Sequence, residues 1–115
     1  MNIELLREYC LSKKATSEAL PFDQDTLVFR VFEKMFALIS LSEPDSVNLK
    51  CDPEKAIELR EHHSCVIPGW HMNKKHWNTI NFDNSVSDKL IKEWIDDSYN
   101  LVVSGLSLKQ KKEIM

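Results

Sequence analysis

The segment from Ser46 to Cys51 carries the pattern that most constrains how this 115-residue chain can fold. Its apolar and polar side chains alternate, with Val47, Leu49 and Cys51 set against Asn48 and Lys50. Since successive side chains of a strand point to opposite faces, the alternation predicts a half-buried antiparallel strand. Asp52 and Pro53 follow directly and suit the N-cap and the first position of a helix. Strand and helix are therefore adjacent in the fold.

Helical periodicity, caps and turn residues predict the other elements. We expect helices at Ile3–Lys14, Pro53–His62, from Ser85 or Ser87 to Gly105, and at Ser107–Ile114. We expect strands at Thr26–Phe32, Met35–Leu41, Ser46–Cys51, Val66–Ile67 and Trp77–Phe82, with a connection at Ala15–Pro21 and a tight turn at Glu33-Lys34. Strands joined by hairpins and flanked by helices predict an α+β domain over residues 1–115, an antiparallel β-sheet with its helices packed on one face.

Charge and hydropathy limit the function classes. The net charge of −3 argues against strong nonspecific binding of nucleic acid, for which a basic domain is typical. The longest apolar run, Met35–Ile39, is too short to span a bilayer. The first residues lack the basic and apolar regions of a secretory signal. We therefore expect a monomer that acts in the cytoplasm and away from membranes.

The cysteines favour neither a disulfide framework nor catalysis. Cys10, Cys51 and Cys65 are odd in number and far apart, so we expect three semi-buried free thiols. A nucleophile pair of Cys65 with His63, or of Cys51 with His71, can be drawn, but no third group that would orient the base can be named. We therefore expect no catalytic residues and no enzyme.

The histidines do not have the spacing of metal ligands. His62 and His63 are adjacent, so their side chains diverge on a helix. His71 and His76 are five residues apart, which is a poor spacing for one helical face. We expect no metal site and no cofactor.

One polar and aromatic stretch, Pro68–Thr79, is harder to explain by folding alone. It holds Trp70 and Trp77, His71 and His76, and the pair Lys74-Lys75. A buried core has little use for so many hydrogen-bonding groups, and a solvated loop has little use for two tryptophans. The stretch is either a recognition surface or a tightly specified structural corner, in which Trp77 would belong to the core.

The same stretch resembles the MmcQ/YjbR family of small bacterial proteins, and its segment His71–Asn78 is the most specific match. Supporting matches lie along nearly the whole chain, at Tyr9–Lys13, Lys34–Leu38, Val47–Cys51 before Pro53, Ile95–Tyr99 and Leu101–Val103. The resemblance implies a frataxin-like (CyaY-type) two-layer α/β sandwich, which agrees with the predicted layout. It also implies DNA binding, the usual label of the family.

The DNA hypothesis assigns roles to a small set of exposed polar and aromatic residues. Lysines would contact phosphates, Asn73 would bind a base edge or a phosphate, and Trp70 would stack on an exposed base. The candidate residues are Lys34, Lys50, Trp70, His71, Asn73, Lys74 and Lys75. The alternatives are a protein–protein interface or a small-ligand pocket that uses the same Trp/His/Asn surface.

The chain departs from the resemblance at three turns. It has Ala15-Thr16 where Pro-Gly is common in the family, Phe32-Glu33 where a glycine often precedes the lysine, and Asn84-Ser85 where Gly-Ser is common. Glu33 also puts a negative charge beside Lys34. If the tip of this hairpin contacted DNA, that charge would repel the phosphates.

Overall fold

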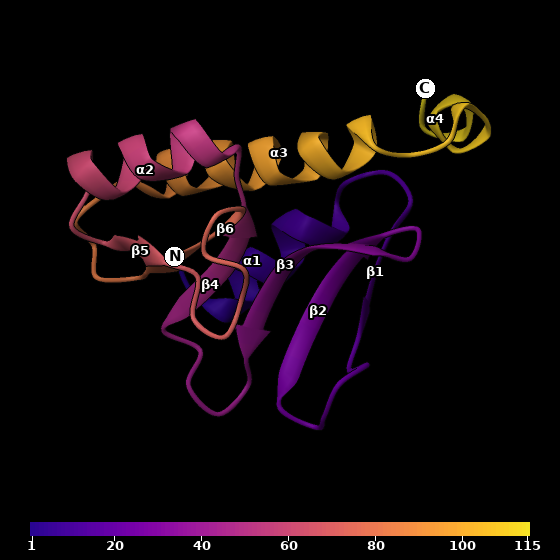
Figure 1. Cartoon of the computed structure of the whole chain (residues 1–115). Helices are drawn as coiled ribbons and strands as arrows, with labels where there is room; N and C mark the ends of the chain where they lie inside the picture. The colour runs from indigo at the N-terminus through magenta and orange to yellow at the C-terminus, as the bar shows by residue number, and fades with distance from the viewer.

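A computed structural model describes residues 1–115 (Figure 1). The helices are α1 (Ile3–Leu11), α2 (Pro53–His62), α3 (Asp88–Ser104) and α4 (Leu108–Ile114). The strands are β1 (Thr16–Ala19), β2 (Thr26–Val31), β3 (Lys34–Ser40), β4 (Ser46–Lys50), β5 (Val66–Pro68) and β6 (Trp77–Asn81). None of the helices is long and apolar enough to cross a membrane.

All six strands form one antiparallel sheet in the order β1-β2-β3-β4-β6-β5. Helices α1, α2 and α3 cover one face, and the main core lies between them and the sheet. The opposite face, here called the open face, is turned toward the viewer in Figure 1 and carries no helix. Alternation along β4 sends Val47 and Leu49 into the core and leaves Asn48 on the open face, as predicted. The predicted fold class is confirmed.

Most predicted elements are confirmed, and the differences are local. Residues 16–19 form an edge strand instead of a connection, so the sheet starts with four consecutive strands rather than three. The β2–β3 turn is Phe32-Glu33 and not Glu33-Lys34, because Val31 pairs with Lys34. Ser87 rather than Ser85 caps α3, its side chain accepting from the Leu90 N–H.

Strand pairing is irregular at one place in the sheet, and a side chain of α3 supplies the missing hydrogen bonds there. The register of β2 against β3 shifts between Phe29 and Arg30, and the β3–β4 ladder pairs only Ala37 with Leu49 and Leu38 with Asn48. Beyond that ladder, the fully buried Ser98 hydroxyl donates to the Phe36 carbonyl (2.6 Å) and accepts from the Lys50 N–H (2.9 Å). One α3 side chain thus bridges two strands where direct pairing fails.

Its neighbours in α3 make further connections. Asp96 accepts from the Tyr9 hydroxyl (2.7 Å) and pairs with the Lys13 ammonium, which ties α3 to α1. Burial, followed by that hydrogen bond, raises the pKa of Tyr9 to about 12. Tyr99 donates to the Lys14 carbonyl (2.6 Å) and holds the start of the α1–β1 connection. This part of the helix therefore serves assembly of the fold.

Left-handed backbone occurs at each of the three turns where the chain departs from the family pattern. Ala15 has a φ of 62°, Phe32 of 52° and Asn84 of 64°. Left-handed backbone favours glycine, because a Cβ there crowds the following carbonyl. In the Phe32-Glu33 turn only the first residue has a positive φ, which is the pattern of a type II′ hairpin turn. The chain accepts strain at these turns.

Replacing Ser98 with alanine should destabilise the fold by about 2–4 kcal/mol, since it leaves a buried N–H and a buried carbonyl without partners. Urea unfolding followed by circular dichroism measures the change. Ser104→Ala is the matched control, because its hydroxyl bonds only a carbonyl of its own helix at the exposed end. Equal losses in the two variants would contradict the bridging role of Ser98.

Replacing Ala15 with glycine should stabilise the protein by roughly 0.5–1 kcal/mol, because the relief of left-handed strain exceeds the added entropy of the unfolded chain. Ala19→Gly, in the extended strand β1, should destabilise instead. Melting temperatures of the two variants check the pair. Destabilisation by Ala15→Gly would show that the turn is not strained.

Candidate functional site: the corner loop on the open face

Residues 69–76 connect β5 to β6 and are here called the corner loop. The loop lies over the open face, in front of β4 and β6 in Figure 1. Its ends are joined by backbone bonds from the Gly69 N–H to the Trp77 carbonyl (2.9 Å) and from the Trp77 N–H to the Asn73 carbonyl (3.0 Å). A Cβ on Gly69 would lie 2.8 Å from the Trp77 Cβ, so only glycine fits this close approach.

The backbone of Trp70 is held on both sides by the sheet. Its N–H donates to the Thr79 hydroxyl (2.8 Å), and its carbonyl accepts from the Asn48 amide (3.2 Å). The Thr79 hydroxyl in turn donates to the Asn48 amide oxygen, which closes the network. Asn48 and Thr79 are cross-strand partners on β4 and β6, so the pairing of these strands fixes both groups.

A second set of contacts holds the loop from the helix layer. The Arg60 guanidinium of α2 donates to the buried Asn78 amide oxygen (2.6 Å) and to the carbonyl of Lys74. The Asn78 amide donates to the Ala56 carbonyl (3.3 Å). No local sequence pattern identifies Arg60 as part of this site, because its partners are 14 to 18 residues away.

These contacts leave the Trp70 side chain projecting into solvent. Trp70 is 66% exposed, while Trp77 is 7% exposed and packs with Val28 and Leu38 beneath the loop. His71 has a left-handed φ of 58°, and its ring lies edge-on to the Trp70 indole with the ring centroids 4.8 Å apart. The loop is thus both a structural corner and the support of one exposed aromatic side chain.

Three of the four candidate lysines lie on the open face or on the corner loop, and the fourth lies near the end of α3. Lys50, on the open face, pairs with Trp77 across the β4–β6 ladder, and Lys74 and Lys75 lie exposed on the loop, Lys74 with its ammonium 3.3 Å from the Gly69 carbonyl. The Lys75 N–H bonds the Asn73 amide oxygen (2.9 Å), so Asn73 also serves the turn. Lys34 is not brought to the loop, because its ammonium lies 3.4 Å from the Gly105 carbonyl at the end of α3.

One cation on this face was missed. Arg30 of β2 shares the open face with Val28, two residues before it, and its Nε is buried without a hydrogen-bond partner. Arg30 of β2 pairs with Met35 of β3, and Lys50 of β4 pairs with Trp77 of β6. The alternation of β2 is the signal that could have found it. No ion pair is formed by any of the four cations, which are Arg30, Lys50, Lys74 and Lys75.

The rest of the open face forms a shallow concavity of about 880 Å³. Exposed Phe22 and Trp70 are among its lining residues, as are three carboxylates, but no Lys or Arg is. Asp25 accepts from the Ser40 hydroxyl (2.6 Å) and the Ser42 N–H (2.8 Å), and these bonds lower the pKa of its carboxyl. Glu43 and Asp45 are exposed, and neither they nor Asp25 pairs with a cation.

The cysteines and His63 are engaged in packing. All three cysteines are free and buried, and burial raises the pKa of the Cys10 thiol to about 12. The His63 ring packs edge-on against Trp94 at 5.1 Å. No group of three or more His, Cys, Asp and Glu side chains lies close enough together to hold a metal ion.

Replacing Thr79 with valine should cost about 2 kcal/mol of stability, because the Trp70 N–H and the Asn48 amide oxygen both lose a partner at constant side-chain volume. Trp70→Ala should change stability by less than about 0.5 kcal/mol, since it removes a mostly exposed side chain. Denaturant titrations compare the two. A larger cost for Trp70→Ala would mean that the indole, rather than the hydrogen bonds to its backbone, anchors the loop.

Comparison with known proteins identifies relatives of this chain. Residues 11–101 match the model of the YjbR family. The Escherichia coli K12 protein YjbR is 34% identical over 113 residues, which cover 97% of this chain and 96% of that one. Escherichia coli O157:H7 YbdF is 38% identical over 95 residues, which cover 82% and 78%. The names of these two relatives state no ligand and no reaction.

Solved structures agree with this relationship. The crystal structure of Deinococcus radiodurans DR2400, described by the domain DUF419, has a TM-score of 0.89 and 39% identity, covering 97% of this chain and 86% of that one. A Pseudomonas syringae crystal structure has a TM-score of 0.75 and 28% identity, covering 88% and 98%. Fold, family model and relatives coincide, and the chain belongs to the YjbR family.

Proposed function

We propose that the protein binds DNA weakly, through Trp70 and a band of cations on and beside the open face. The band comprises Arg30, Lys50, Lys74 and Lys75. The observation that carries the proposal is that these four cations have no carboxylate partner, while the neighbouring indole is held in solvent by hydrogen bonds to its backbone. Unpaired cations are available to phosphates, and an exposed indole is available to a base.

The geometry fits a short stretch of phosphate backbone. Arg30 on β2 and Trp77 on β6 are three strand spacings apart, or roughly 14 Å, with Lys50 between them. Few contacts and a net charge of −3 make the interaction weak and sensitive to salt. A DNA ligand implies action in the cytoplasm, and the proposal assigns the protein binding without catalysis. Lys34 of β3 is left out of the band, because it pairs with core-facing Val31 and its ammonium lies at the Gly105 carbonyl on the helix side of the sheet.

Lys74→Ala/Lys75→Ala should weaken binding to a labelled duplex and reduce the slope of log K against log salt by about two, one for each phosphate contact. Fluorescence anisotropy at several salt concentrations measures both quantities. Lys14→Ala/Lys89→Ala is the matched control, because it removes the same charge from exposed sites at the start of the α1–β1 connection and in the first turn of α3. Its slope should equal that of the unmodified protein.

Two outcomes would overturn the proposal. The first is no binding at low salt. The second is equal weakening by both double variants, which would mean a response to net charge alone. Trp70→Ala separates the alternatives on the same surface: a protein partner would lose more from this change than from the loss of the lysines, since large aromatic anchors dominate such interfaces. A DNA complex should lose affinity from both.

A further inference from the structure

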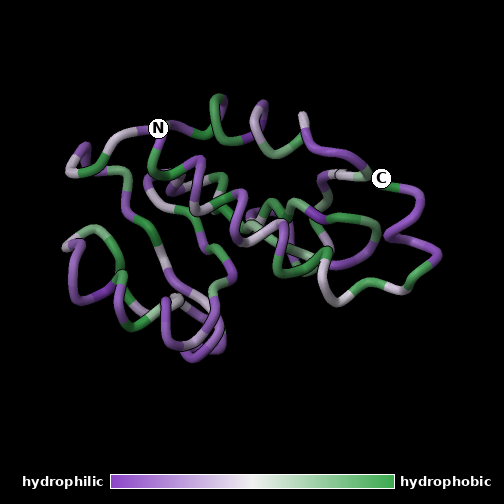
Figure 2. Tube along the Cα trace, turned by 90° about the horizontal axis from the view of Figure 1, so that it is seen from above, coloured by the Kyte–Doolittle hydropathy of each residue, from purple (hydrophilic) through white to green (hydrophobic).

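The C-terminal helix α4 presents apolar side chains to solvent. Leu108 is 76% exposed and Met115 is 91% exposed. Leu108 and Lys112 lie one turn apart on α4, Lys109 follows Leu108, and Met115 comes directly after the last residue of the helix. Ile114 packs toward the core from another side of the helix. Figures 1 and 2 both show α4 projecting from one end of the molecule, beyond the end of α3.

This outward face has the composition of a contact surface. An apolar pair flanked by lysines buries little in its own chain, although α4 is a well-formed helix with a complete capping box at Ser107 and Gln110. Most of the stability of a short helix comes from packing of an apolar face. The face of Leu108 and Met115 has no such packing within this chain.

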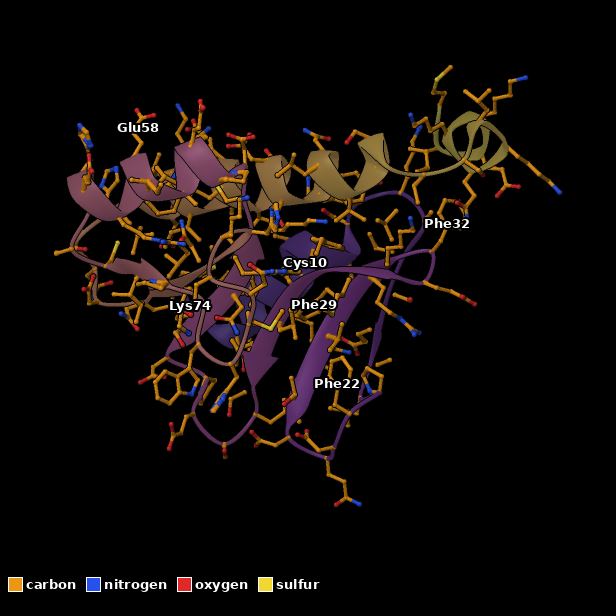
Figure 3. The ribbon with its side chains drawn as sticks, viewed as in Figure 1. Cys10, Phe22, Phe29, Phe32, Glu58 and Lys74 are labelled. Atoms are coloured by element: carbon orange, nitrogen blue, oxygen red, sulfur yellow. The ribbon has the colours of Figure 1, made fainter.

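A surface of complementary chemistry lies elsewhere on the molecule. The acidic end of the open face consists of the β1–β2 and β3–β4 loops with the adjoining concavity. It carries the unpaired carboxylates Asp25, Glu43 and Asp45, and exposed Phe22 and Trp70 line the same concavity. Figure 3 shows Phe22 at the lower edge of the sheet, far from α4 at the upper end. The α4 of one copy therefore does not reach the acidic end of that copy.

We propose that the outward face of α4 docks on the acidic end of the open face in a second copy of this chain. Lys109 and Lys112 would lie against the carboxylates, and Leu108 and Met115 against the exposed aromatic side chains. An amphipathic helix laid in a groove is a common mode of recognition. A second copy is the occupant because both surfaces, opposite in charge and each with exposed apolar side chains, belong to the same chain. The inference does not depend on DNA binding.

The geometry of the contact determines its behaviour in solution. Two different surfaces meet, so the contact is heterologous and leaves one α4 and one acidic end free at the ends of each assembly. Growth is therefore head-to-tail, and the mean mass rises with concentration without stopping at a dimer. Exposed charges supply part of the attraction, so salt weakens the association.

Sedimentation of the full chain over a range of concentrations at low salt tests the contact. We expect the weight-average mass of the unmodified protein to rise with concentration and Lys112→Glu to abolish the rise. Lys89→Glu is the matched control, because the change of charge is the same and Lys89 is exposed in the first turn of α3, outside α4. A monomer at every concentration, or equal effects of the two variants, would overturn the proposal.

Charge reversal on the other surface completes the test. Glu43→Lys/Asp45→Lys should also abolish the rise, while Glu58→Lys, on the outer side of α2 in Figure 3, should leave it unchanged. A mixture of Lys109→Glu/Lys112→Glu with Glu43→Lys/Asp45→Lys should associate again, because each reversed helix then meets a reversed groove. Failure of the mixture, with both variants folded by circular dichroism, would contradict docking between these two surfaces.

Discussion

The fixed position of the corner loop depends on polar side chains that reach it from both layers of the molecule. Thr79 and Asn48 hold the backbone of Trp70 from the open face, and Arg60 holds the Lys74 carbonyl from α2. Each of these groups would be costly to bury without a partner, and the loop supplies the partners. The loop is therefore part of the hydrogen bonding of the fold, and a mostly exposed tryptophan is the side chain that this arrangement presents.

This arrangement changes the interpretation of the polar residues that carry the family resemblance. Asn78 and Thr79 join the loop to the fold, and Asp96, Ser98 and Tyr99 join α3 to its neighbours. A polar residue in a characteristic motif is then no evidence of a ligand by itself. The side chains that remain for recognition are those left exposed or unpaired once this bonding is complete, and Trp70, Lys74 and Lys75 are among them.

Local patterns predicted the fold because its main elements depend on neighbours in sequence. Asp52 and Ser87 cap their helices within a few residues, and the alternation of β4 fixes its faces. Strand β1 was missed because Thr16–Ala19 has little apolar content and pairs with a strand on one side only. The partners of Arg60 and Ser98 lie 14 to 62 residues away, and the position of Lys34 depends on Gly105, 71 residues along the chain. Such contacts leave no mark on local periodicity.

Positive and negative side chains gather at opposite ends of the open face, which the net charge of the chain does not reveal. Arg30 and Lys50 occupy one end of the face, at the hairpin end of β2 and the helix end of β4, whereas Asp25 and Asp45 precede the other ends of these strands. A polyanion near this face would be attracted at the first end and repelled at the second, and exposed charges lose this influence beyond about 8–10 Å at ordinary salt. A nucleic acid bound as proposed would therefore lie toward the cationic band, whereas the carboxylates at the other end of the concavity would favour a ligand of opposite charge.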